Sequence, residues 1–237
     1  MSKIMLFMWG FLIAQTASLA TTAYLHRSSS HQAVTFHPVV EFIWQGILWL
    51  ITGINRKEWV AVHLCHHAHA DLLGDPHSPI ILGFWKVQLG NIFLYRKAAK
   101  NPDVLRYGRH IRPSWAEQTI FRSPTLGLLI GVSFACTMWG LWPGLIISAV
   151  HAFLYLFVLN SLVNGYCHWQ GYKNFPGVTA FNSHLVAWIT MGEGFHNNHH
   201  AKPASAKLSE TPSEYDGGWA AINFLRHLHL ATLNRSF

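Results

Sequence analysis

Two long apolar runs constrain most strongly what this chain can fold into. The first, Ile4–Leu25, and the second, Thr125–Val163, contain no Asp, Glu, Lys or Arg. Because about 20 apolar residues cross the hydrocarbon core of a bilayer, the first run predicts one membrane span. The second is long enough for about two spans, with a turn at Trp142-Pro143-Gly144. Charged residues make up only 11% of the chain, against about 25% in a soluble domain. These features predict an all-α, integral-membrane helical bundle.

A signal peptide is the rival interpretation of the first run, since Lys3 precedes it and small residues occur near its end. Its apolar stretch is longer than the roughly 7–15 residues of a signal peptide. We therefore expect a span, with the short N-terminus outside.

The other segments predict a helical cap beside the membrane. Val39–Ile54 is apolar but short, so it is expected to lie in the interface or dip partway into the bilayer. Arg56–Arg122 is polar and basic, which predicts cytoplasmic helices and turns. From Asn164 the chain is polar again, interrupted by Phe181–Met191, and ends in a helical tail around Trp219–Leu233. We expect one domain, residues 1–237, with three to four spans and a cytoplasmic helical cap.

The charge distribution favours lipid over nucleic acid as the neighbour of the basic residues. The formal net charge is +7, and ten of the 17 Lys and Arg residues lie between Arg56 and Arg122. Such a concentration between apolar segments follows the positive-inside bias and suits anionic headgroups. No nucleic-acid-binding module is present in the sequence. The 17 histidines outnumber the ten acidic residues, which indicates metal binding.

Two copies of the motif His-x-x-His-His carry the clearest chemical signal. On a helix, positions i, i+3 and i+4 share one face, so each triplet can direct three imidazoles at one point. For either copy alone, the alternative is a polar helix face without a metal. Chance would give only about 0.09 copies of the motif in a chain of this composition, so two copies are rarely accidental. The two triplets are His63, His66, His67 and His196, His199, His200.

Two further pairs lie next to the apolar runs. His26 and His31 follow the first run, but five residues on an α-helix are about 140° apart. We therefore expect a bend at Ser28–Ser30 to bring them together. Asn164 and His168, at i and i+4, follow the second run and should point to the same side. Headgroup contacts or helix capping are the alternative roles for these pairs.

Nine histidines in these four places suit two metal ions, each with four or five imidazole ligands and an open position for oxygen. Zinc usually takes four ligands and does not change oxidation state. Iron is the usual choice for one-electron and oxygen chemistry, so iron is predicted.

Acidic residues near the motifs predict hydrogen bonds to the ligand imidazoles. His69 and His77 flank Asp71 and Asp75 just after the first triplet, where such bonding is expected, with solvent-facing roles as the alternative. Glu193 precedes the second triplet and could orient a ligand, although its flanking glycines also suggest a simple turn.

These motifs, in this order, resemble the membrane fatty acid desaturase family, especially the acyl-CoA and acyl-lipid delta-9 type. The resemblance covers about residues 21–209 and rests on HRSSSH (26–31), HLCHH (63–67), DPHSP (75–79), NGYCHW (164–169), GYKNF (171–175) and GEGFHNNHH (192–200). It implies that nine residues bind a di-iron centre: His26, His31, His63, His66, His67, His168, His196, His199 and His200. It also implies that Asn164 holds a metal-bound water.

The resemblance implies an enzyme that uses O2 and two electrons to introduce a cis double bond into a long acyl chain. Since no fused electron carrier is expected, a separate ferredoxin or small haem carrier would dock on the basic cytoplasmic face. Members of this family usually have four spans. Either the start is truncated, or Val39–Ile54 substitutes for the missing span.

Two alternatives remain open at the level of sequence. A related di-iron enzyme could hydroxylate, epoxidise or oxidatively decarboxylate an acyl or alkyl chain with the same histidine motifs. A non-catalytic membrane protein that binds or transports metal would instead place its ligands within the spans. Here the histidine motifs lie outside the apolar runs, on one side of the membrane.

Overall fold

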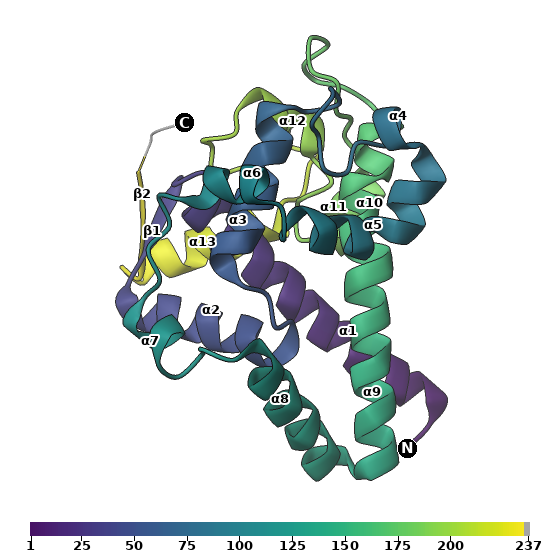
Figure 1. Ribbon diagram of the computed structural model, residues 1–237, viewed down its shortest axis with the longest axis vertical. Coiled ribbons are helices and arrows are strands. Elements are labelled where there is room, and N and C mark those ends of the chain that lie inside the picture. The colour runs from purple at the N-terminus through teal and green to yellow at the C-terminus, as the bar shows by residue number, and fades with distance from the viewer. Residues whose placement is uncertain (235–237) are drawn as a thin grey trace.

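Helices dominate the structure, a computed structural model in which residues 1–234 are described. In Figure 1, α1 (Lys3–Ala20), α8 (Pro124–Trp139) and α9 (Leu141–Phe153) form the lower part of the molecule. Most of the remaining helices gather above them. The prediction of a helical protein is thus confirmed, apart from one short pair of strands.

Two continuous helices are long and apolar enough to cross a membrane. In the first, Lys3–Ser30, α1 continues into a π-helix, η1 (Thr21–Ser30). The second, Leu141–His168, consists of α9, a π-helix η3 (Leu154–Leu159), α10 (Asn160–Asn164) and a 3₁₀ turn η4 (Tyr166–His168). Each has 28 residues, or about 42 Å of α-helix.

Two other helices are apolar but shorter. α2 (Pro38–Ile51) has 14 residues and α8 has 16. α8 leaves large apolar side chains exposed, among them Leu129 and Phe134, as expected of a helix that faces lipid. Within residues 1–234 two helices therefore meet the length of a full span, and the predicted total of three to four crossings stays a prediction.

The turn between α8 and α9 lies before the predicted position. The chain reverses at Gly140, whose φ of +90° favours glycine. Pro143 lies in the first turn of α9 instead, where the missing N–H costs no helical hydrogen bond. The predicted turn at residues 142–144 is therefore wrong by a few residues. α9 returns along α8 and also packs against α1, where the backbone of Gly10 lies against Val150.

The polar segments form short helices joined by turns, as predicted for residues 56–122. The helices of that segment are α3 (Arg56–Ala68), α4 (Pro79–Leu82), α5 (Phe84–Ala98), α6 (Pro102–Leu105), η2 (Arg106–Gly108) and α7 (Trp115–Gln118). Those after the second long helix are α11 (His184–Ile189), α12 (His196–Ala201) and α13 (Gly217–His227).

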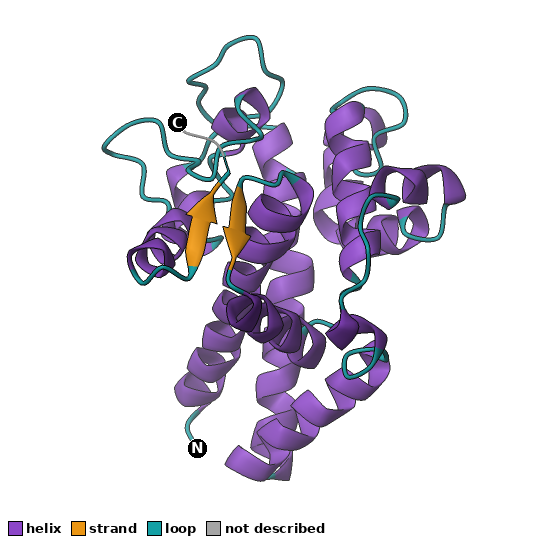
Figure 2. Ribbon diagram, turned by 90° about the vertical axis from the view of Figure 1, so that its left-hand side faces the viewer, coloured by secondary structure: helices purple, strands orange, loops and turns teal. Residues whose placement is uncertain are grey.

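A two-stranded antiparallel sheet corrects the predicted helical tail. α13 ends at His227, and β2 (Ala231–Leu233) then pairs with β1 (Val34–Phe36) (Figure 2). All three residues of β1 are β-branched or aromatic, and the central residue of β2 is a threonine. Such residues favour strands. The pairing ties the end of the described chain to a strand that begins three residues after His31.

Candidate metal centre

The first histidine triplet lies on α3. The Asn55 side chain starts this helix by accepting a hydrogen bond from the Glu58 backbone N–H at 3.1 Å. The regular helix then places His63, His66 and His67 on one face, as the spacing predicted. His66 is buried, whereas the other two are half-buried.

The second triplet lies on α12, which has only six residues. The surrounding loops hold this short helix through the two asparagines of its sequence. The Asn197 side chain accepts backbone hydrogen bonds from Asn174 and Phe175 at 3.0 and 2.8 Å. Both asparagines are buried, so the histidine face is fixed from behind.

His26 and His31 come together on the π-helix η1 and its end. The His31 N–H donates to the His26 carbonyl at 3.1 Å, an i→i+5 hydrogen bond. The two imidazole rings lie 5.0 Å apart. The predicted bend at residues 28–30 is therefore wrong, because the wider turn of a π-helix brings residues five apart to one side.

The imidazoles converge in two groups. In each group the facing donor atoms all lie within 4.8 Å of one another. The five-histidine group consists of His26, His31, His63, His67 and His199. The four-histidine group consists of His66, His168, His196 and His200. The structure thus gathers nine of the ten predicted site residues. Each triplet is divided between the groups: His66 lies with His196 and His200, and His199 lies with His63 and His67.

The spacing of the nitrogens fits metal coordination. Nε2 of His31 lies 2.7 Å from Nε2 of His63, and Nε2 of His199 lies 2.8 Å from that of His67. Metal–imidazole bonds of about 2.0–2.1 Å, set at right angles, place two nitrogens about 3 Å apart. In addition, Nε2 of His168 is buried and has no hydrogen-bond partner among the described residues. The donor set therefore fits a pair of metal ions.

Burial keeps the three imidazoles of the first triplet neutral, as metal ligands must be. Desolvation lowers the pKa of His63 and of His66 well below the usual value, and nearby imidazoles lower it further. The same causes lower the pKa of His67 to about 2. Neutral imidazoles offer a lone pair to a metal, so the groups are built to accept cations.

Three carboxylates orient imidazoles of the two groups from behind. Nδ1 of His66 donates to Asp75 at 2.9 Å, and Nδ1 of His168 donates to Asp71 at 2.8 Å. Each bond fixes the tautomer and leaves Nε2 free to face the metal. The hydrogen bonds predicted around Asp71 and Asp75 are therefore present.

Glu193 fills both roles that the sequence suggested. Its carboxylate accepts from Nδ1 of His26 at 2.7 Å and also from the Thr22 hydroxyl. Burial would raise the pKa of Glu193, but His26 and Arg27, together with these hydrogen bonds, hold it at about 2. The preceding Gly192 has a φ of +100°, so the segment is a turn as well.

His77 and His69 take different positions. The His77 ring packs beside His66, with ring centroids 4.6 Å apart, and its backbone N–H donates to Asp75 at 3.0 Å. His66, Asp75 and His77 also lie close together, but Asp75 already accepts from Nδ1 of His66 and from the His77 backbone N–H. We therefore interpret this group as a hydrogen-bonded cluster. The His69 ring instead lies against Tyr107.

Asn164 lies four residues before His168 in the sequence, and its side chain contacts another asparagine. It ends α10, and its side-chain amide donates to Asn91 at 3.1 Å. His168 ends the following 3₁₀ turn. The i, i+4 prediction assumed one α-helix through both residues, and the structure does not have one. The role of Asn164 in holding a metal-bound water stays a prediction.

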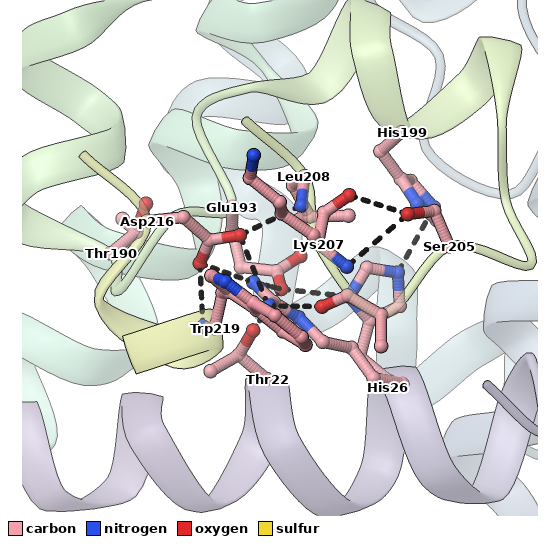
Figure 3. A network of polar contacts seen from close by, with 12 residues as sticks. Thr22, His26, Thr190, Glu193, His199, Ser205, Lys207, Leu208, Asp216 and Trp219 are labelled. Carbon is pink, nitrogen blue, oxygen red and sulfur yellow. Dashed lines mark hydrogen bonds and ion pairs between the residues drawn. The ribbon is translucent and has the colours of Figure 1, made fainter. Parts of the chain in front are cut away.

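Sequence reasoning missed a buried layer behind the histidines. Figure 3 shows part of it, with Glu193 hydrogen-bonded to His26 and Asp216 farther from that ring. Arg27 pairs with Asp216 at 2.8 Å, and the Glu214 carboxylate accepts from Asn198 at 2.9 Å. A usable signal was present: acidic residues are scarce in this chain, and three of the ten, Glu210, Glu214 and Asp216, follow the last triplet closely.

Comparison with known proteins agrees with this geometry. The fatty acid desaturase family model matches residues 3–210. An acyl-CoA C20 Delta5-desaturase from Anemone leveillei is 30% identical over 232 residues, which cover 93% of this chain and 70% of that protein.

Bacterial relatives are similar to a comparable degree. An sn-1 stearoyl-lipid 9-desaturase from Synechocystis sp. is 31% identical, over 91% of this chain and 67% of its own length. One from Anabaena variabilis is 30% identical, over 92% of this chain and 79% of its own length. The chain belongs to the fatty acid desaturase family.

Proposed function

We propose that this protein is a fatty acyl desaturase, an O2-dependent oxidoreductase that introduces a cis double bond into a long acyl chain. The single observation that carries the proposal is the convergence of nine imidazoles into two groups in a member of this family. The relatives described above are an acyl-CoA desaturase and two stearoyl-lipid desaturases. No observation favours hydroxylation or decarboxylation over desaturation.

We propose iron as the metal of both groups, with Asn164 as a tenth residue of the site. Five imidazoles exceed the usual four ligands of zinc. When bound, iron supplies the O2 and one-electron chemistry needed to remove hydrogen from an unactivated methylene. The chain's own residues fix the orientation of the imidazoles: Asp71, Asp75 and Glu193 accept from the far ring nitrogens of His168, His66 and His26.

The two long apolar helices support a multi-pass position in the membrane. We propose that Lys3–Ser30 and Leu141–His168 cross the bilayer, with α8 and, in part, α2 completing a bundle of three to four crossings. His26 and His168 lie at the C-terminal ends of these two helices. The histidines of α3 and α12 gather around them. The basic segment 56–122 favours the cytoplasmic side for these ends of the helices. The helical cap of the single domain would lie on the same side.

The partners follow from the reaction class. The substrate is a long acyl chain, which the surrounding lipid delivers or an acyl carrier brings. Two electrons must come from outside the histidine centre. A separate ferredoxin or small haem carrier with an acidic surface would suit the basic cap.

The test is the fatty acid profile of cells that express the chain. Gas chromatography with mass spectrometry, after derivatisation to locate double bonds, should show a new unsaturated acid. The acid should disappear with His199→Ala and persist with His227→Ala, a change at an exposed histidine on α13. A product heavier than the substrate by one oxygen atom would show that the enzyme is a hydroxylase and would contradict the proposal.

A further inference from the structure

Two acidic side chains beyond the last histidine motif point inward. Glu214 and Asp216 are 5% and 4% exposed, whereas Tyr215 between them is 62% exposed. An extended segment sends alternate side chains to opposite sides, which explains this pattern. Both lie past residue 210, where the match to the family model ends.

Glu214 is saturated with hydrogen bonds. Its Oε2 accepts from the Asn198 amide at 2.9 Å, and its Oε1 accepts from the Tyr172 hydroxyl at 2.7 Å. Further donors are the Asn174 amide at 2.8 Å and the backbone N–H groups of Glu210 at 2.6 Å and Thr211 at 3.2 Å. A carboxylate with this many donors is fixed in one orientation.

Asn198 carries that constraint to the metal ligands. It lies between His196 and His199 on α12 and is 2% exposed. Its amide also donates to the Leu208 carbonyl at 2.9 Å, and its oxygen accepts from Asn182 at 2.8 Å. Because a six-residue helix is not stable alone, these bonds set where α12 points its imidazoles. α12 supplies ligands to both histidine groups.

Asp216 holds the other side of the centre through Arg27. The guanidinium donates to both carboxylate oxygens, at 2.8 and 3.1 Å, and to the Ala206 carbonyl at 2.7 Å. The side chains of the pair are each 1% exposed. Asp216 also accepts from the backbone N–H groups of Leu208 and Trp219 (Figure 3). The pair therefore clamps residues 206–219 to the helix that carries His26.

Arg27 is adjacent in sequence to His26, and its guanidinium also lies 3.9 Å from the Glu193 carboxylate that accepts from His26. Gly192 allows the Asp216 carboxylate to lie close to this segment, since a Cβ at position 192 would collide with it. A continuous chain of contacts thus runs from Asp216 through Arg27 and Glu193 to the His26 imidazole.

We propose that Glu214 and Asp216 are positioning residues of the metal centre, which together set the ligands on α12 and on η1. The proposal rests on the proposed function for the identity of the site as a metal centre. Asp216 acts on the five-histidine group through His26, whereas Glu214 acts on both groups through α12. Loss of either carboxylate leaves buried donors unpaired, which displaces the elements that they hold.

Metal binding by the purified full chain tests this without substrate or activity. Co(II) titration, followed by absorption, reports the affinity and ligand field of each group. Asp216→Asn should weaken binding at the five-histidine group about tenfold or more and leave the other group unchanged. Glu214→Gln should weaken both. Glu210→Gln is the matched control, because Glu210 lies in the same loop and its carboxylate pairs with the exposed Lys202 at 2.8 Å.

Two conservative variants guard against misfolding. Asp216→Glu and Glu214→Asp keep the charge but change the reach by one methylene, and they should fold while showing the same pattern of weakened binding. Parental affinities and spectra in these variants, or losses equal to that of Glu210→Gln, would overturn the proposal. A chain that binds two Co(II) ions in this pattern but never desaturates would instead count against the proposed function alone.

Discussion

The backbone N–H of His31 donates to the carbonyl of His26 across five residues, at 3.1 Å. An α-helix would separate the two side chains by about 140°, but the π-helix η1 brings both imidazoles into the five-histidine group. Isolated π turns are rare and occur mostly at functional sites. Here the wide turn has a clear use, since it lets one unbroken helix supply two imidazoles to the same group.

A side-chain bond supports this wide turn. The Ser30 hydroxyl donates to the Leu25 carbonyl at 2.8 Å and so spans the same five-residue step. Ser30→Ala should destabilise the protein by about 1 kcal/mol, because a buried carbonyl loses its donor. Thermal unfolding in detergent would measure the change.

Ser28→Ala is the control for that experiment, since Ser28 lies in the same turn and is only half-buried. The supporting role of the Ser30 hydroxyl would be rejected if both variants unfolded at the parental temperature.

The histidine positions were largely predictable because metal binding depends on short, regular spacings. The motif on α3 needed only α-helical periodicity to place His63, His66 and His67 on one face. Which imidazole joins which group was not predictable, because it depends on how α3 and α12 pack against each other. His66 and His199 each leave the group that a simple one-triplet, one-metal scheme would give them.

Other features depended on tertiary contacts that leave a weak local signal. The pairing of β2 with β1 joins residues about 200 positions apart, so the tail alone suggested a continuing helix. The Arg27–Asp216 pair is separated by 189 positions. A lone arginine at a membrane boundary resembles a headgroup contact in sequence, and only the fold reveals its buried carboxylate partner.

Single ligand removals should separate the two groups. His66 belongs to the four-histidine group and His199 to the five-histidine group. His66→Ala and His199→Ala should each abolish desaturation, while each loses metal chiefly from its own group. Metal analysis of the purified variants, with desaturation measured in cells, would check this. Wild-type iron content together with full activity in either variant would contradict the ligand assignment.

Metal removal should destabilise the fold. The centre places Nε2 of His31 and Nε2 of His63 2.7 Å apart in a buried site, an arrangement that a bound cation stabilises. A ligand that binds only the folded state adds about 4 kcal/mol at 1,000 times its Kd. A chelator should therefore lower the unfolding temperature by several degrees, and added Fe(II) should restore it. An unfolding temperature insensitive to both would mean that the histidine groups hold no metal in solution.

Asp71 offers the sharpest test of how the carboxylates orient ligands. It accepts from His168 at 2.8 Å and from the Ser78 hydroxyl at 2.7 Å, and its backbone has a φ of +60°. Asn tolerates that conformation, so Asp71→Asn removes the charge without new backbone strain.

The amide that replaces the Asp71 carboxylate no longer stabilises the tautomer of His168 that frees Nε2. Metal affinity at the four-histidine group should fall about 10–100-fold, whereas the five-histidine group should be unaffected. Asp103→Asn is the control, because its carboxylate is 76% exposed and pairs with Arg106 at the surface. Isothermal titration with Co(II) would measure both variants. Equal affinities in the Asp71 and Asp103 variants would show that packing alone, without the carboxylate, orients His168.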